Sequence, residues 1–245
     1  MAKRPIPTPR QMTTMTNARS RPGHLIIGCD EVGRGACAGP LVVVGVLAAR
    51  TWDHELARDS KKMSHEKHVA AFETFLNYTN PIPEIKAVLL AKYDFLDVDT
   101  LGVDAANKDL TKRIAQELYR LCPSPVMLDG EMLPFIEGIP QEDLFNMVNA
   151  DALVPVSGAA SMIAKAFRDK EMCAYHDLYP QYDWAYNKGY LTMGHAAALK
   201  EHGACLVHRL SYTRVAESKM SDAVRQSRIN PNPPCPWACW LKKAI

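Results

Sequence analysis

The sequence predicts an α/β fold in which helices flank a mixed central sheet. Apolar runs of strand length occur at residues 25–29, 41–47 and 126–128, and an alternating apolar run occurs at 85–91. Apolar residues at helical spacing separate and follow these runs. Strands that alternate with helices favour a layered domain built around one sheet.

The expected helices have recognisable boundaries. They are predicted from Ser64 to about 76, at 110–121, at about 157–175, and between Thr192 and Gly203. Ser64 and Thr192 are residues that cap a helix N-terminus with their hydroxyl groups. Gly203 suits the C-terminal end of the last helix, because glycine often ends helices.

The 245 residues are expected to form one large domain at 24–228 with a segment on either side. Residues 1–23 carry five basic residues and no acidic one, which predicts a disordered basic arm. This arm is open to two interpretations, a phosphate-contacting or solvated arm and an organelle transit peptide. The tail at 229–245 contains Pro, Trp and Cys, and it either packs onto the body or serves as a contact segment.

Composition excludes some classes of protein. The net charge is only +2, so a nucleic-acid-binding surface would have to be local. No apolar run reaches the roughly 18 residues that a membrane helix needs, so no membrane contact is expected. Seven cysteines without a secretory-type segment predict reduced thiols in the cytoplasm. Cys235 and Cys239 have no second pair at the spacing of a zinc site.

Carboxylates follow two of the predicted strands. Asp30 and Glu31 end the strand at 25–29, and Asp129 ends the strand at 126–128. In α/β sheets, ligands gather beyond the carboxyl ends of the strands. Hard oxygen donors favour Mg²⁺ or Mn²⁺, which would relieve the repulsion between such acids. The alternative is that one acid pairs with Arg34 and the other faces water.

The small-residue helix at 157–175 carries a third acidic position. Ser161, Lys165, Arg168 and Asp169 lie on one side of it at helical pitch. Cations that bind phosphate beside a metal-binding carboxylate are what phosphodiester chemistry requires. A solvated polar stripe is the alternative interpretation.

Six blocks of sequence, spread over roughly residues 25–215, carry specific motifs. They are residues 28–40 (GCDEVGRGACAGP), 59–64 (DSKKMS), 128–130 (LDG), 158–169 (GAASMIAKAFRD), 179–182 (YPQY) together with 188–192 (KGYLT) and His195, and 208–212 (HRLSY). In this order, the six blocks resemble the motifs of the ribonuclease HII (type 2 ribonuclease H) family. Six ordered blocks make chance agreement negligible.

The resemblance implies an RNase H-like fold and a set of site residues. The four implied metal-binding and catalytic acids, with Mg²⁺ or Mn²⁺ as cofactor, are Asp30, Glu31, Asp129 and Asp169. The implied substrate-binding residues are Gly33, Arg34, Gly35, Lys61, Ser161, Lys165 and Tyr190. Glycine lets the backbone approach a sugar closely, and the 2′-OH is the group that separates RNA from DNA.

The implied function is two-metal hydrolysis of the RNA strand in RNA–DNA hybrids. Nicking on the 5′ side of single ribonucleotides in duplex DNA is also implied, with 5′-phosphate and 3′-OH products, as in ribonucleotide excision repair. The protein is expected to act as a cytoplasmic monomer. The alternatives are a nuclease of this fold that needs longer RNA tracts, and a non-catalytic hybrid-binding subunit, against which the four intact acids speak.

Three departures from the family pattern concern substrate positioning and rate. Asn187 stands where the family usually has His, and Tyr212 replaces a common Phe. Residues 149–151 read Asn-Ala-Asp in place of a common Lys-Gly-Asp. None of these changes removes one of the four acids.

Overall fold

The structure is a computed structural model that describes residues 24–52, 72–74, 82–130, 134–228 and 237–243. The expected basic arm at 1–23, Lys61 and most of the expected helix after Ser64 lie outside these residues. The strands are β1 (Leu25–Val32), β2 (Leu41–Ala49), β3 (Ile85–Tyr93), β4 (Val126–Asp129), β5 (Leu144–Met147) and β6 (Trp237–Lys243).

Helices separate and follow these strands, as the sequence predicts. The α-helices are α3 (Phe95–Leu101), α4 (Val103–Leu121), α5 (Ala150–Leu153), α6 (Pro155–Leu178), α7 (Trp184–Asn187), α8 (Met193–His202), α9 (Thr213–Ala216) and α10 (Asp222–Gln226), and the 3-10 helices are η3 (Gln141–Asp143) and η4 (Pro180–Tyr182). The predicted boundaries of α8 are confirmed, because the Thr192 hydroxyl accepts from the His195 N–H and Gly203 ends the helix.

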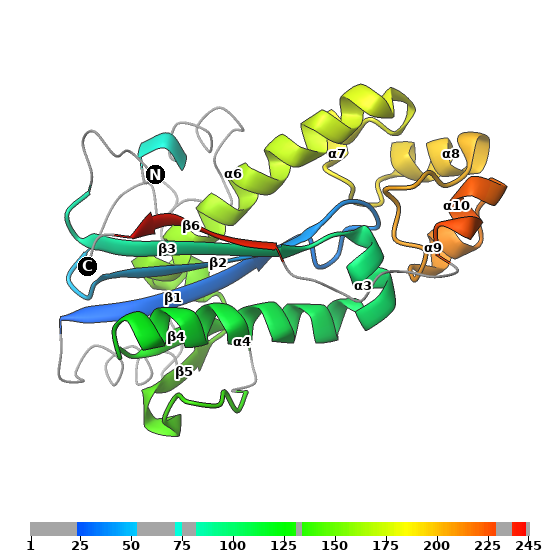
Figure 1. Cartoon of the computed structure of the whole chain (residues 1–245). Coiled ribbons are helices and arrows are strands. Elements are labelled where there is room, and N and C mark those ends of the chain that lie inside the picture. Colours follow the sequence, from blue (N-terminus) through cyan, green and yellow to red (C-terminus); the bar gives the residue numbers. More distant parts are fainter. Residues whose placement is uncertain (1–23, 53–71, 75–81, 131–133, 229–236, 244–245) are drawn as a thin grey trace.

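A six-stranded mixed sheet forms the centre of the molecule (Figure 1). The strand order is β5-β4-β1-β2-β3-β6. β2 pairs antiparallel with β1 and β3, and β3 pairs antiparallel with β6. β4 runs parallel to both β1 and β5. The predicted α/β fold with a mixed sheet is confirmed.

Helices cover both faces of the sheet. Alternate residues of β2 point to opposite faces, as the strand period of two requires. Val42, Val44 and Val46 pack in a core cluster with α6, whereas Val43 and Leu47 pack in a second cluster with α4. This two-sided burial explains why β2 reads as a continuous apolar run.

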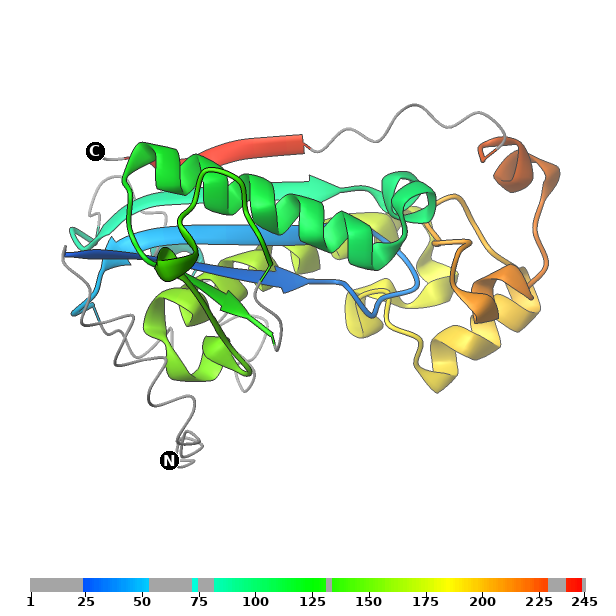
Figure 2. The ribbon, with the colours of Figure 1, turned by 90° about the horizontal axis from the view of Figure 1, so that it is seen from below.

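A third core cluster lies beyond the carboxyl end of β1, where α7, α8 and α9 gather (Figure 2). Trp184 is fully buried there and stacks on Tyr182, with ring centroids 5.1 Å apart. This cluster packs against Cys37 and Ala38 in the loop between β1 and β2. The end of β1 that carries the acidic residues therefore faces a separately packed group of helices.

The tail packs onto the body through its backbone. Within it, β6 pairs with β3 at the edge of the sheet, so part of the tail belongs to the central sheet. The division of the chain into an arm, a domain and a tail stays a prediction. In the part of the chain that the structure describes, no helix has the length and apolar character that crossing a membrane requires.

Candidate active site

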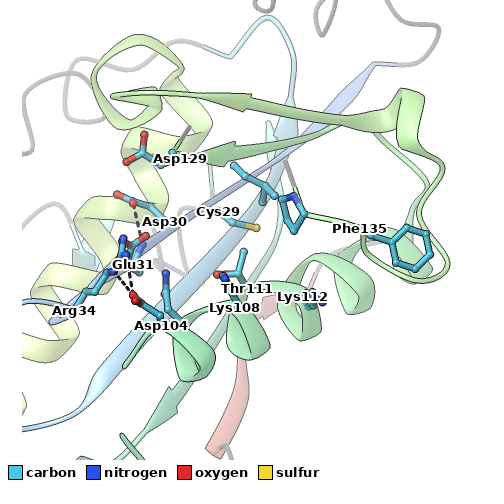
Figure 3. A pocket seen from close by; sticks show the side chains of 14 residues that line it. Cys29, Asp30, Glu31, Arg34, Asp104, Lys108, Thr111, Lys112, Asp129 and Phe135 are labelled. Atoms are coloured by element: carbon cyan, nitrogen blue, oxygen red, sulfur yellow. Dashed lines mark hydrogen bonds and ion pairs between the residues drawn. The ribbon is translucent and has the colours of Figure 1, made fainter. Parts of the chain in front are cut away.

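The carboxylates of β1 and β4 lie side by side. Cys29 and Leu128 are partners in the parallel pairing of these strands, so Asp30 and Asp129, the next residues, lie near the carboxyl ends of neighbouring strands. Asp30, Glu31 and Asp129 line one pocket with a volume of about 720 Å³ (Figure 3). The structure thus brings together three of the four predicted acids.

Crowding and burial make negative charge costly in this pocket. Burial raises the pKa of Asp30 well above its usual value, and the negative charge of Glu31 raises it further. A hydrogen bond with Ser161 acts in the opposite direction. Burial, and then the charge of Asp129, raise the pKa of Glu31, whereas Arg34 lowers it. A cation between these groups would offset the repulsion.

The fourth predicted acid, Asp169, lies on α6. This helix packs closely on β1. A Cβ at Gly28 would lie only 2.7 Å from the Ser157 nitrogen, so the absence of a side chain at Gly28 permits this close approach. The buried Asp169 carboxylate accepts from Lys165 Nζ at 3.2 and 3.0 Å. Asp169 is not among the described residues that line the pocket of the other three acids. In this structure, Asp169 is thus paired with Lys165 on the same helix and does not line the pocket.

The donor atoms of this site suit a hard divalent cation. Asp30, Glu31, Asp129 and Asp169 supply only carboxylate oxygens, the ligands that Mg²⁺ and Mn²⁺ prefer. Within the described residues, no group of three or more His, Cys, Asp or Glu side chains is already arranged to hold a metal ion. The donor set fits such an ion, and some side chains would have to turn toward it.

Gly35, at the end of the Gly33–Gly35 segment, lies beside Tyr190. A Cβ at Gly35 would meet Tyr190 Cε1 at 3.8 Å, and Tyr190 is partly exposed. Arg34 points elsewhere: its guanidinium forms an exposed ion pair with Asp104 at 2.8 Å. The alternative interpretation, in which one of the strand-end acids pairs with Arg34, therefore does not match the structure, although Arg34 still lowers the pKa of Glu31.

Arg168 has a structural role and is not a phosphate ligand. Its side chain is fully buried, although helical spacing placed it on the polar face with Lys165. The guanidinium donates to the carbonyl oxygens of Pro40, Lys188 and Ala38 at 2.9, 2.7 and 2.9 Å. Arg168 thus ties the loop after β1 to the segment before Tyr190.

A second buried arginine holds the same loop. Arg209 donates to the carbonyl oxygens of Gly39 and Gly33 at 2.9 and 2.7 Å. Its Nη1 also donates to the Tyr212 hydroxyl at 3.2 Å, and this hydroxyl donates to the Arg34 carbonyl. Tyr212, one of the three departures, therefore adds a contact to the loop that a phenylalanine lacks.

Asn187, another departure, holds the turn that carries Tyr190. Its Nδ2 donates to the Tyr182 carbonyl at 2.6 Å, and its Oδ1 accepts from the Gly189 N–H at 2.9 Å. An amide can make both contacts at once because it carries a donor and an acceptor. The side chain is thereby engaged in local backbone contacts beside Tyr190.

Sequence reasoning missed two groups of residues near the site. Asp151 is buried at the start of α5, and its charge raises the pKa of both Asp30 and Glu31. The signal was present, since this Asp matches the last residue of the Lys-Gly-Asp block that is common in the family. The pocket-lining side chains of α4, which include Lys108 and Lys112, carried no motif that could have identified them.

Comparisons with known proteins agree with this site and fold. A family model described as "Ribonuclease HII" matches residues 27–215. Ribonuclease HII of Polaromonas sp. strain JS666 is 37% identical over 197 residues, covering 79% of this chain and 92% of the relative. Ribonuclease HII of Coxiella burnetii is 34% identical over 203 residues, covering 83% of this chain and 95% of the relative.

Solved structures show the same fold at low identity. A chain of the PCNA:RNase HII complex from Archaeoglobus fulgidus matches with a TM-score of 0.61 and 22% identity, covering 77% of this chain and 95% of that chain. Bst-RNase HIII in complex with Mn²⁺ matches with a TM-score of 0.59 and 15% identity, covering 85% of this chain and 72% of that chain. The predicted RNase H-like fold is confirmed.

Proposed function

Because this chain belongs to the ribonuclease HII family of metal-dependent endoribonucleases that act on RNA–DNA hybrids, we propose that it also nicks duplex DNA at single ribonucleotides. Cleavage takes place on the 5′ side of the ribonucleotide and leaves a 5′-phosphate and a 3′-OH. The observation that carries this proposal is the convergence of Asp30, Glu31 and Asp129 in one pocket beside the Gly33–Gly35 loop.

In this proposal, Asp30, Glu31, Asp129 and Asp169 hold two divalent cations. Such cations, when bound by these carboxylates, would supply activation of a water molecule and stabilisation of the leaving oxygen. The raised pKa values of Asp30 and Glu31 support this role, because burial first and neighbouring carboxylates second make their negative charge costly, and a bound cation would offset that cost. Asp129 is already oriented by the Ala150 N–H, which donates to its Oδ1 at 2.9 Å.

Recognition of the ribonucleotide is assigned to the loop after β1 and to Tyr190. The backbone of Gly33, Arg34 and Gly35 would contact the 2′-OH, and the Tyr190 ring would stack on the following deoxyribose. The contact between Gly35 and Tyr190 supports this assignment, because both groups can then touch one dinucleotide.

The remaining substrate-binding residues are assigned to the phosphates and to the positioning of Asp30. Lys165 would bind a phosphate after leaving Asp169, and Lys61 would bind another. Ser161 would orient Asp30 through the hydrogen bond between them. Arg34 can also reach the nucleic acid, because its ion pair with Asp104 is exposed and therefore easily exchanged.

The choice of metal and the setting are part of the proposal. Mg²⁺ or Mn²⁺ is expected. The structural match to an RNase HIII in complex with Mn²⁺ supports Mn²⁺ as a cofactor. We expect the protein to act as a monomer in the cytoplasm. The free state of the five cysteines whose side chains are described agrees with a reducing compartment.

Cleavage of an RNA–DNA hybrid by an Asp129→Asn variant tests the assignment of the acids. The Asn oxygen still accepts from the Ala150 N–H, so the fold should persist while turnover falls by at least 1,000-fold, an order of magnitude typical for loss of a metal-binding catalytic group. Asp177→Asn, an exposed change on α6, is the matched control and should cut at the normal rate. Near-normal turnover by the Asp129 variant would exclude Asp129 from catalysis.

A further inference from the structure

The pocket of the acidic residues extends well past them. Its volume of about 720 Å³ lies in the range of sites for whole organic ligands, which is more room than two hydrated cations need. Figure 3 shows Asp30, Glu31 and Asp129 toward one end and Phe135 at the other. Between them, the wall is formed by side chains of α4: Asp104, Asn107, Lys108, Thr111 and Lys112.

These α4 residues form one stripe along the helix. Their spacing of three and four residues places them on one side of α4, and the opposite side is buried against the sheet through Leu110 and Ile114. Lys108 and Lys112 are one turn apart, and such a pair of like charges weakens a helix slightly. Neither ammonium has an ion-pair partner among the described residues. A bound anion would remove this repulsion.

Two other side chains of the pocket also have unused binding capacity, one for a hydrogen bond and one for a stacking contact, and a ligand could fill both. Asn107 Oδ1 is buried and accepts no hydrogen bond in the described structure, which is costly for an amide oxygen. Phe135 is 74% exposed, so its ring presents an open apolar face at the far end of the pocket. An acceptor, two cations and an exposed aromatic ring match the donors, phosphates and base faces of nucleic acid.

We infer that Asn107, Lys108, Lys112 and Phe135 form a nucleic-acid-binding surface, here called the Lys108–Phe135 track. This track binds the part of the nucleic-acid strand that lies beyond the catalytic carboxylates. Lys108 and Lys112 bind successive phosphates, since residues one helical turn apart are separated by roughly 5–6 Å, comparable with neighbouring phosphates of a strand. Phe135 stacks on a base beyond them. This inference rests on the proposed function, which supplies the nucleic acid at the carboxylates.

The double substitution Lys108→Gln, Lys112→Gln tests the phosphate contacts. With a hybrid duplex and Mg²⁺, the KM should rise about tenfold while kcat changes less than twofold, because the track binds the strand away from the reacting bond. The slope of log kcat/KM against log salt concentration should fall by about 1.8, the loss of two phosphate contacts. Lys86→Gln, near the start of β3 at the opposite end of the sheet, is the control and should leave both values unchanged.

Substitutions of Phe135 test the stacking contact. Phe135→Ala and Phe135→Leu should each raise the KM about fivefold or more, because the alanine and leucine side chains cannot stack on a base. Phe135→Trp should keep the KM at or below the normal value. Equal KM values for the Leu and Trp variants would show that the ring contributes only apolar area and would overturn the stacking role.

Direct binding separates this inference from the proposed function. The anisotropy of a fluorescein-labelled hybrid duplex, measured in chelator, reports affinity without turnover. A Kd about tenfold weaker for the double lysine variant supports the track, even if cleavage by the normal protein fails. An unchanged Kd and an unchanged salt slope overturn it, whether or not the normal protein cuts the duplex.

Discussion

The Nε2 atoms of His195 and His208 lie 3.0 Å apart in a fully buried pair. His208 Nδ1 accepts from the Cys205 N–H at 3.1 Å, so its Nε2 carries the proton and donates to His195. His195 Nδ1 then donates to the Tyr190 carbonyl at 3.0 Å. Two neutral rings thus connect the core of the α7–α9 region to the backbone of Tyr190, the residue proposed to stack on the deoxyribose after the ribonucleotide.

The histidine pair predicts acid sensitivity of the fold. Burial, followed by the proximity of His195 and then Arg228, lowers the pKa of His208 from 6.5 to about 3. The unfolded chain takes up a proton as the pH falls below 6.5, whereas the folded chain does not, so stability is lost toward acid pH. The free energy of unfolding should drop by about 2 kcal/mol between pH 7 and pH 5.

Urea unfolding at several pH values measures this effect. In a His208→Asn variant, the Asn oxygen can replace Nδ1 as the acceptor but does not titrate. This variant should be less stable at pH 7, and its stability should depend less on pH between 7 and 5. An equally steep dependence in both proteins would assign the acid sensitivity to other groups.

Gly33 and Gly35 should respond differently to the same substitution. Gly33 has a φ of +90°, and a Cβ there would lie 2.3 Å from Arg168 Nε and 2.7 Å from the Pro40 oxygen, so Gly33→Ala should destabilise the fold by roughly 2–4 kcal/mol. Gly35→Ala meets only Tyr190 at an ordinary distance and should leave the melting temperature nearly unchanged.

The Gly35→Ala variant should nevertheless cleave a single-ribonucleotide duplex poorly. Its methyl group would occupy the space beside Tyr190 in which the ribose is expected to bind, so kcat/KM on a single-ribonucleotide duplex should fall by about 100-fold. Melting curves and cleavage rates of the two variants provide the check. Normal cleavage by a stable Gly35→Ala protein would argue against ribose binding at this loop.

Arg168→Lys should destabilise the protein although it keeps the charge. One ammonium cannot reproduce the geometry in which the guanidinium donates to Pro40, Lys188 and Ala38, so at least one buried carbonyl loses its donor. The expected loss is about 2–3 kcal/mol of unfolding free energy, measured by urea titration. Arg120→Lys, in an exposed ion pair, is the control and should change stability by less than about 0.5 kcal/mol.

Tyr212→Phe tests a contact that this chain adds to the family pattern. Loss of the hydroxyl removes the hydrogen bond to the Arg34 carbonyl and the one from Arg209, which should cost about 1–2 kcal/mol of stability. The KM should rise more than kcat falls, because the loop is held less firmly for substrate. Tyr186→Phe, on an exposed ring, serves as the control. If the two variants behave alike, the Tyr212 hydroxyl does not hold the loop.

Local patterns predicted most of the fold. The apolar runs of β1–β4, the amphipathic stripe of α4, and the caps of α8 at Thr192 and Gly203 are all signals contained in a few neighbouring residues. β5 was missed because the segment 144–147 has only four residues, too few to show the alternation of a strand. β6 was missed because its pairing with β3 joins segments more than 140 residues apart, and no local pattern reports such pairing.

The candidate site, like the fold, could be predicted only where neighbouring residues carry the signal. The acids at the ends of β1 and β4 could be predicted because strand ends meet at one edge of a sheet. The role of Arg168 could not, because periodicity gives the side of a helix but not whether that side faces water or the loop at 38–40. The histidine pair and the α4 stripe depend on packing between distant segments, which sequence spacing does not describe.

Cleavage of a DNA duplex with one embedded ribonucleotide tests the central claim most directly. The substrate carries separate end labels on the ribonucleotide-containing strand, and the reaction is run with Mg²⁺, with Mn²⁺ and with chelator. The account predicts one nick on the 5′ side of the ribonucleotide, with a 3′-OH upstream, and no cutting in chelator. Cutting of long RNA–DNA hybrids without this nick would contradict the assignment of ribose recognition to Gly33–Gly35 and Tyr190, and would mark the chain as a nuclease that needs longer RNA tracts.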